Sequence, residues 1–312
     1  MVEISLTTTE EKAIDDREQR ELVEQERALR AAPPKLNKSP LHGLWALTNR
    51  DLVKWYKNPI QLFITLIQPI VWLGLFGKAL NFDSFITSQP GIAQAQINAI
   101  NVATFGVSNY FSFLSAGMLA FIILFTAAFA GMSVVWDRRF GFMNKALSTP
   151  VGRGVIVTGK VLQSVIRSLI QAAIVLAIAI ALGMDTSHMT VLTIAGAFTI
   201  LFLMSFGLSS LFVMLALRSS DWQTQMAIIN LLNLPLLFAS NAMLPVKIMP
   251  SWLQTVVKLN PVSYANDATR QLLLGSTATL GVPLWMDFGV LIGFAVVLSA
   301  LGIVLSWKLL SK

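Results

Sequence analysis

Long apolar runs separated by polar stretches fill most of the 312-residue chain. Six runs each come close to the ~20 residues that an α-helix needs to cross the hydrocarbon core of a bilayer. The pattern therefore predicts an all-α membrane protein with six transmembrane helices. Pro69 and Pro235 stand inside two of the runs and should bend those helices, which neighbouring helices can tolerate. The predicted spans cover residues 60–80, 110–135, 161–183, 191–217, 225–244 and 285–307.

The chain before the first run has two parts. Residues 1–40 are charged and too polar for a signal peptide, and we expect them to form a cytoplasmic tail ahead of a membrane domain at 41–312. Residues 41–57 are amphipathic, with leucines and Trp55 able to share one helical face. This pattern predicts a helix that lies in the cytoplasmic interface of the membrane. The residues of interest on this interfacial helix are Arg50, Asp51 and Trp55.

The connection between the fifth and sixth runs carries two shorter apolar stretches, 252–259 and 264–274. Neither is long enough to cross a bilayer. We therefore expect two re-entrant or interfacial helices that dip into the membrane from the outer side. The residues of interest in this outer region are Asn260, Pro261, Tyr264 and Arg270.

Positive charge is distributed unevenly around the runs. Most of the 23 Lys and Arg residues lie before the first run, between the second and third, or after the sixth. Because cytoplasmic loops carry an excess of Lys and Arg, both termini are expected in the cytoplasm of a multi-pass protein of the plasma membrane. The same bias explains the net charge of +7 without a nucleic-acid partner.

Composition agrees with a bilayer as the main solvent and excludes several kinds of chemistry. Hydrophobic residues make up 55% of the chain, and charged residues make up 12%, about half their share in a soluble domain. Without cysteine, the chain can form no disulfide, thiolate metal site or Cys nucleophile. His42 and His188 lie far apart in the sequence, so no metal site is expected.

Catalytic and energy-converting motifs do not occur in the sequence. There is no G-x-x-x-x-G-K-[ST] phosphate loop, no HExxH motif and no nucleophile elbow. Asp137, Asp185, Asp221 and Asp287 all fall at span ends, whereas transporters driven by protons or sodium keep ionisable residues at membrane depth. We therefore expect no catalytic residue in this chain, and we expect a partner to supply the energy.

One charged residue, Arg167, falls inside a predicted span. Its long side chain can reach back to the cytoplasmic interface. Alternatively, its guanidinium contacts an anionic lipid or substrate group. The sequence leaves both interpretations open.

The basic loop at 136–160 is the best candidate for a docking surface. Apolar residues stand among its basic residues, so a short helix there could place them in a groove of a partner. The alternative is a loop held against the membrane by Trp136, Arg138 and Arg139. Physical reasoning alone does not separate the two.

Three stretches carry a family resemblance. They are LTNRDLVKWYKNPIQLFITLIQPIVWLGLFG at 47–77, WDRRFGFMNKALSTPVGRGVIVTGKVL at 136–162 and FASNAMLPVKIMPSWLQTVVKLNPVSYANDATRQLLLG at 238–275. Together, in this order and on a frame of six spans, they resemble the ABC-2 family of transporter permeases, especially the export permeases of the daunorubicin-resistance type. The resemblance covers residues 41–312, essentially the whole membrane part.

The resemblance implies a dimer, formed by two copies or by this chain and a paralogue, bound to two ATP-binding cassette ATPase subunits that hold ATP and Mg. It implies export, and across the family the cargo includes drugs, lipids, glycans and polyketides. It also implies that a short loop helix couples ATP binding to movement of the spans. Many relatives carry Glu where Arg139 stands. A salt bridge from such a Glu to the ATPase or to the interfacial helix is therefore not expected in this chain. The residues of this coupling loop are Arg138, Arg139, Gly141, Phe142, Met143, Lys145 and Leu147.

The leading hypothesis is a permease whose pathway lies between two chains and is lined by the first, second and fifth spans. The alternative is an autonomous secondary transporter or channel, which an intramembrane carboxylate would support. A membrane-embedded enzyme that modifies lipid is a third interpretation, and it would need convergent His, Asp or Glu residues. Aromatic residues within spans also serve helix packing or face lipid. The candidate lining residues are Phe63, Phe76, Phe113, Phe121, Asn230 and Asn233.

Overall fold

The computed structural model describes residues 40–79, 94–107, 109–149, 152–219, 221–276 and 279–309. Over these ranges the chain is helical and contains no β-strand. It separates into two units, Met1–His42 and Gly43–Lys312, and almost all of the predicted tail lies outside the described residues. The elements are α2 (Pro40–Tyr56), α3 (Pro59–Gly74), the π-helix η1 (Leu75–Ala79), α5 (Gln94–Phe105), α6 (Tyr110–Arg139), α7 (Phe142–Leu147), α8 (Arg153–Ala181), α9 (Val191–Ala216), α10 (Trp222–Phe238), the 3₁₀-helix η2 (Val246–Ile248), α11 (Ser251–Leu259), α12 (Pro261–Leu274) and α13 (Leu284–Leu309).

Four helical stretches in the described ranges are long and apolar enough to cross a membrane. They coincide with four of the six predicted spans, so the prediction of an all-helical protein with several apolar spans is confirmed. Helix α8, which carries the third predicted span, starts at Arg153 and so extends beyond the predicted boundary at residue 161. The four stretches are Ala99–Arg139, whose helical part from Tyr110 on is α6, and Arg153–Ala181, Val191–Ala216 and Leu284–Trp307.

The first predicted span is a composite helix. α3 ends at Gly74, and the π-helix η1 continues it to Ala79. At about 1.5 Å per residue, this continuous segment measures roughly 30 Å, close to the thickness of the hydrocarbon core.

The fifth predicted span is shorter than expected. α10 ends at Phe238, so the predicted end at residue 244 is wrong. The carbonyl oxygens of Leu236 and Ala239 accept hydrogen bonds from the side-chain amide of Asn260, at 2.8 and 2.7 Å. These bonds replace the backbone donors that a longer helix would supply to its last carbonyls.

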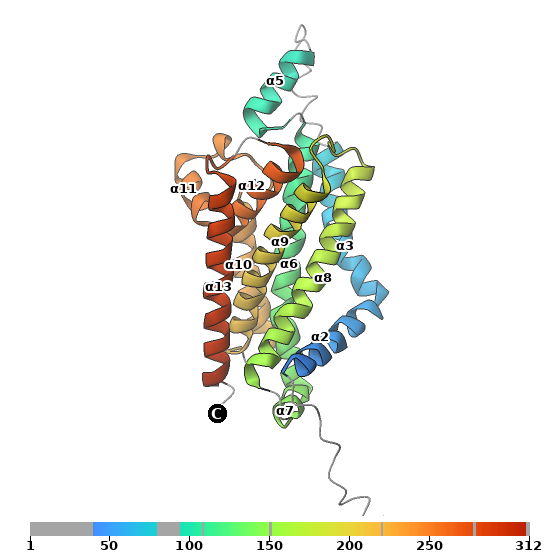
Figure 1. Ribbon diagram of the computed structural model, residues 1–312, viewed down its shortest axis with the longest axis vertical. Helices are drawn as coiled ribbons and strands as arrows, with labels where there is room; N and C mark the ends of the chain where they lie inside the picture. The colour runs from blue at the N-terminus through green and yellow to red at the C-terminus, as the bar shows by residue number, and fades with distance from the viewer. Residues whose placement is uncertain are drawn as a thin grey trace, which may run out of the picture. The chain divides into compact units, whose positions relative to one another are not determined.

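Helix α6 forms the centre of the bundle (Figure 1). It contacts α3, α8, α9, α10 and α12, and nearly all of its residues before Trp136 are buried. A helix that is apolar on every side needs neighbours on every side. The absence of a polar stripe in its sequence is therefore explained by its central position.

Short polar side chains connect the central helices. Thr126 on α6 donates a hydrogen bond of 2.6 Å to the Gln171 side chain on α8, which in turn donates one of 2.6 Å to Thr65 on α3. The hydroxyl oxygens of Ser168 and Ser205 lie 2.7 Å apart between α8 and α9. Such bonds between helices are typical of membrane bundles, where apolar contact does not distinguish protein from lipid.

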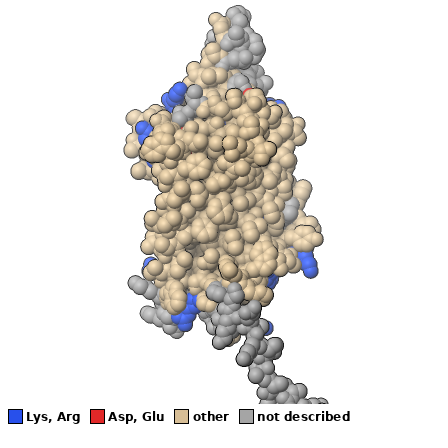
Figure 2. Space-filling view, viewed as in Figure 1, with Lys and Arg blue, Asp and Glu red and all other residues tan. Residues whose placement is uncertain are grey.

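The two ends of the bundle differ. Helix α7, with the adjoining ends of α6 and α8, forms the α7 end, and α5, α11 and α12 lie at the opposite, α12 end (Figure 1). On the face shown in Figure 2, Lys and Arg side chains gather near both ends and leave an uncharged band between them. A lipid-facing surface requires such a band. The chain is therefore a multi-pass membrane protein.

Candidate functional site

An ion-pair cluster joins three helices at the α7 end. Arg50 and Asp51 belong to α2, Asp137 to α6 and Lys160 to α8. Each cation contacts both carboxylates, with Arg50 at 2.5 and 2.7 Å and Lys160 at 2.6 and 2.5 Å from Asp51 and Asp137. The Lys160 side chain is only 7% exposed. Breaking a largely buried pair is costly, so the cluster holds α2 against α6 and α8.

Helix α2 also approaches α8 through small groups. The Thr48 hydroxyl is buried and donates a 3.4 Å hydrogen bond to the carbonyl oxygen of Gly159. A Cβ atom at Gly159 would lie 3.3 Å from Leu47, so glycine permits the close approach. Trp55, further along α2, is 6% exposed. The amphipathic segment predicted at 41–57 is therefore a helix whose apolar side contacts its own chain.

One side of helix α7 is anchored to the bundle. Gly141 has a φ of +74°, a conformation that favours glycine and that reverses the chain between α6 and α7. The Phe142 ring lies 3.4 Å from the guanidinium carbon of Arg50. Met143 is 4% exposed and packs among valines of α6 and α8. Two predicted coupling residues, Phe142 and Met143, therefore contact their own chain.

Arg138 joins the loop to the neighbouring helix α9. Its guanidinium donates hydrogen bonds to the carbonyl oxygens of Leu217 and Ser219, both at 3.0 Å. Carbonyls at the C-terminal end of a helix lack backbone donors, and a cation there is also favoured by the helix dipole. Arg138 is therefore engaged within the chain.

Other residues of the loop are exposed. Arg139 and Lys145 are exposed, and the Phe140 side chain is 80% exposed. Leu147 belongs to α7, but its side chain lies outside the described part of the chain. The loop therefore offers a partner two exposed cations and an exposed aromatic ring.

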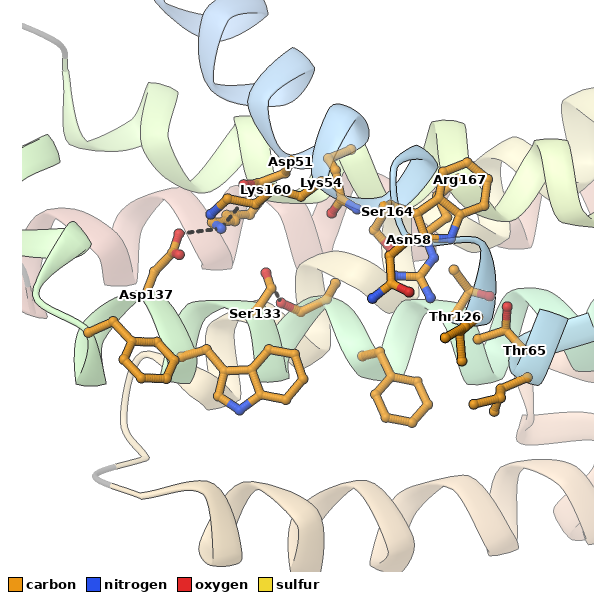
Figure 3. A pocket seen from close by; sticks show the side chains of 18 residues that line it. Asp51, Lys54, Asn58, Thr65, Thr126, Ser133, Asp137, Lys160, Ser164 and Arg167 are labelled. Carbon is orange, nitrogen blue, oxygen red and sulfur yellow. Dashed lines mark hydrogen bonds and ion pairs between the residues drawn. The ribbon is translucent and has the colours of Figure 1, made fainter. Parts of the chain in front are cut away.

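A cleft of about 610 Å³ opens beside the ion-pair cluster, bordered by α2, the start of α3, α6 and α8 (Figure 3). Arg167 lines its deeper part, is 7% exposed and has its guanidinium carbon 5.5 Å from the Trp55 ring. Because α8 begins at Arg153, Arg167 lies roughly 20 Å along that helix. The structure thus places this cation in a buried wall of the cleft.

Asn260 organises the α12 end. Its side-chain oxygen accepts a 3.0 Å hydrogen bond from the backbone of Val262 and so caps α12, while its amide binds the last carbonyls of α10. Pro261 occupies the first turn, where its missing N–H is not needed. The Tyr264 hydroxyl donates a 2.7 Å bond to the carbonyl oxygen of Lys258. The two predicted short helices therefore meet at Asn260.

Arg270 is fully buried at the same end. Its guanidinium donates hydrogen bonds to the carbonyl oxygens of Phe113, Asn241 and Ala242, at 3.2, 2.8 and 2.9 Å. Two of these carbonyls belong to the non-helical segment after α10, whose backbone needs internal partners. Burial lowers the pKa of the Arg270 guanidinium and the Asp267 carboxylate opposes that shift, and a guanidinium stays protonated in proteins.

A second polar cluster at this end has no counterpart in the sequence predictions. Asp267 accepts hydrogen bonds of 2.6 and 2.5 Å from the backbone and hydroxyl of Thr279. Gln271 donates to Asp267 at 3.2 Å and to Asp287 at 3.0 Å. Asp287, predicted at a span end, is fully buried in the first turn of α13. Asp267 and Gln271 are four residues apart, which puts them on one helix face. This spacing is the feature of the sequence from which the cluster could have been predicted.

The six candidate lining residues do not share one surface. Three are enclosed within the chain, each with 3% exposure or less. The other three face outward at least partly, and Phe76 among them stacks on Trp72 with the ring centroids 4.8 Å apart. The enclosed residues are Phe113, Phe121 and Asn233, and the others are Phe63, Phe76 and Asn230.

Residues 42–274 match the family model described as ABC-2 type transporter. The transport permease ycf38 of Pyropia yezoensis is 31% identical over 235 residues, which cover 75% of each chain. The ycf38 protein of Cyanophora paradoxa is 29% identical over 234 residues, or 74% of each chain. The daunorubicin resistance ABC transporter permease protein DrrB1 of Streptomyces coeruleorubidus is 24% identical over 257 residues, or 82% of each chain.

The matched segment contains the ion-pair cluster, the α7 loop and the buried Arg270. Members of this family are the membrane subunits of ATP-binding cassette transporters and are distinct from the ATPase. The family therefore normally works with an ATP-binding subunit. This chain has a bundle of apolar helices and matches the family model over most of its length. It therefore belongs to the ABC-2 type transporter family.

Proposed function

We propose that this chain is the permease subunit of an ATP-binding cassette exporter that moves an amphipathic drug-, lipid- or glycan-like substrate outward. The observation that carries the proposal is the loop around α7, which is anchored at some residues and exposed at others. Helix α7 is anchored to the bundle through Phe142 and Met143, whereas Lys145 on α7 and the preceding residues Arg139 and Phe140 are exposed. A helix held in this way can receive a displacement from a partner and pass it to the bundle.

The ion-pair cluster supports a route for that displacement. Phe142 contacts Arg50 on α2, Arg50 contacts Asp137 on α6, and Asp137 contacts Lys160 on α8. A shift of α7 would therefore be transmitted to α2, α6 and α8 together. ATP and Mg would bind to two copies of a cassette ATPase, and the second permease would be another copy or a paralogue. ATP would then bias a two-state movement of the spans.

The proposal includes a topology. The α7 end would face the cytoplasm, with both termini there, 1–40 as a tail and 41–312 as the domain in the plasma membrane. Of six spans, the first would be formed by α3 together with η1, and the fifth would be formed by α10. Helices α11 and α12 would be re-entrant from the outer side. The exposed basic residues of the loop at the α7 end support this orientation.

The pathway would lie between two chains. Phe63 on α3 and Asn230 on α10 face outward and suit a lining role at such an interface. The enclosed residues Phe113, Phe121 and Asn233 would act through the packing of the helices behind that surface. Substitution of the outward residues should therefore change substrate preference more than it changes folding.

One observation favours the alternative of an autonomous, ion-coupled transporter. Asp287 is fully buried, shares Gln271 with Asp267, and has one carboxylate oxygen without a hydrogen-bond partner among the described residues. Buried carboxylates of this kind serve as proton relays in pumps and transporters. Asp287 lies at a span end, as predicted, and both it and Asp267 are buried there.

The two functions are separated by purifying the tagged chain in mild detergent and measuring the bound ATPase and its activity. The exporter predicts a stoichiometric soluble ATPase, bound about tenfold less tightly by Phe140→Ser because an exposed aromatic anchor is lost. Trp252→Ser, which changes an exposed aromatic at the α12 end, is the matched control and should bind the ATPase normally. A chain that purifies alone and hydrolyses no ATP would contradict the exporter and direct attention to Asp287.

A further inference from the structure

Two residues that line the cleft between α2, α3, α6 and α8 each carry an enclosed N–H group without an acceptor. Arg167 Nε and Trp55 Nε1 are both buried and have no hydrogen-bond partner among the described residues. More than nine in ten buried polar groups are paired in proteins, and an unpaired buried cation is especially unfavourable. Such donors mark a place where an acceptor, and above all an anion, is stabilised.

The charges of the cleft favour an anion as well. Its two carboxylates, Asp51 and Asp137, each pair with both Arg50 and Lys160. Lys54 is exposed at the cleft, and no described carboxylate lies within 4.0 Å of Lys54 or Arg167. The two cations therefore remain available to a negatively charged ligand, while the neighbouring carboxylates are already neutralised.

The rim of the cleft is apolar where α3 and α6 border it. Ile60 and Ile64 on α3 are 70% and 60% exposed, and Phe129 on α6 is 38% exposed. In a multi-pass protein such side chains face acyl chains. Arg167 follows Lys160 by seven residues on α8, which places it roughly 10 Å deeper than the ion-pair cluster. The cleft thus combines a cationic inner wall with an apolar rim.

We infer that this cleft binds the anionic phosphate group of an amphipathic molecule, with Arg167 and Trp55 as donors and the acyl chain along Ile60 and Ile64. A guanidinium suits phosphate because its fork of N–H groups can bind two oxygens at once. The volume of about 610 Å³ lies within the range of small-molecule sites. Free phosphate shares this chemistry, so the source of the anion is decided by experiment.

Binding is measured on the full chain in neutral detergent, as the shift of the thermal midpoint with added phosphatidylglycerol, diacylglycerol or inorganic phosphate. Phosphatidylglycerol should raise the midpoint, and diacylglycerol, which lacks the phosphate, should not. Arg167→Gln should weaken binding of phosphatidylglycerol by about 10- to 100-fold, because a charge-assisted contact is lost. Arg218→Gln removes an exposed arginine at the end of α9 and should bind as the wild type does.

A second variant guards against a folding defect. Arg167→Gln should fold, because it removes an unpaired buried charge. Trp55→Phe keeps an aromatic ring but removes the indole N–H together with the five-membered ring, so it should weaken binding by about 2- to 10-fold. Both readouts are independent of the ATPase, so their failure is distinguishable from a failure of the proposed exporter.

The outcomes separate the sources of the anion. Equal affinity of the wild type and both variants for phosphatidylglycerol, or an equal response to diacylglycerol, would overturn the inference. A midpoint shift with phosphatidylglycerol alone, lost in Arg167→Gln, supports an amphiphile headgroup. An equal shift with inorganic phosphate, also lost in Arg167→Gln, supports the phosphate site and assigns it to the free ion.

Discussion

Replacing Arg270 with methionine should lower the free energy of unfolding by about 4 kcal/mol or more. The wild-type guanidinium is fully buried and donates to three backbone carbonyl oxygens. Each hydrogen bond to a charged group contributes about 1.5–3 kcal/mol, so three bonds amount to roughly 4.5–9 kcal/mol. The variant no longer buries a charge, which offsets part of this loss and places the expected value near the lower end. Methionine retains much of the side-chain length, so the cavity contribution stays small.

The assay is unfolding of the purified chain in mixed micelles with an increasing fraction of denaturing detergent, followed by circular dichroism. Arg270→Lys should lose about 2 kcal/mol, because an ammonium keeps the charge but cannot reach three carbonyls with one planar fork. Arg218→Met, at an exposed arginine, is the control and should stay within about 0.5 kcal/mol of the wild type. A loss below about 1 kcal/mol for Arg270→Met would refute the idea that these carbonyls depend on Arg270.

Three further substitutions test other contacts. Asp137→Asn should lower stability by about 3 kcal/mol, because its two cationic partners lose a carboxylate; an unchanged thermal midpoint would show that the cluster does not hold the α7 end. Gly131→Ala would bring a Cβ within 2.5 Å of the Phe212 carbonyl oxygen and should cost about 1–3 kcal/mol, whereas Gly289→Ala meets nothing within 4 Å and serves as its control in the same melting assay. Asn260→Ala removes a helix cap and should cost about 1–2 kcal/mol, seen as faster hydrogen exchange in α12; equal exchange rates would contradict the capping role.

The sequence by itself determined the features that depend on neighbours along the chain. Runs of about 20 apolar residues require helices in a bilayer, because every backbone group must be satisfied within the segment. Asn260 followed by Pro261 predicted a break between two short helices, since an Asn cap and a proline in the first turn are local signals. The glycine at Gly141 likewise agrees with the chain reversal before α7.

Only the tertiary structure decided which charges meet and which apolar residues face inward. Arg270 donates a hydrogen bond to the carbonyl oxygen of Phe113, 157 residues away in the sequence. The residues next to either position do not predict that contact. Phe63 and Phe113 looked equivalent as lining candidates, yet one is 65% exposed and the other fully buried. The physical reason is that lipid is as apolar as the interior of the bundle. Hydrophobicity therefore places a residue in the membrane, whereas packing and buried hydrogen bonds decide which way it faces.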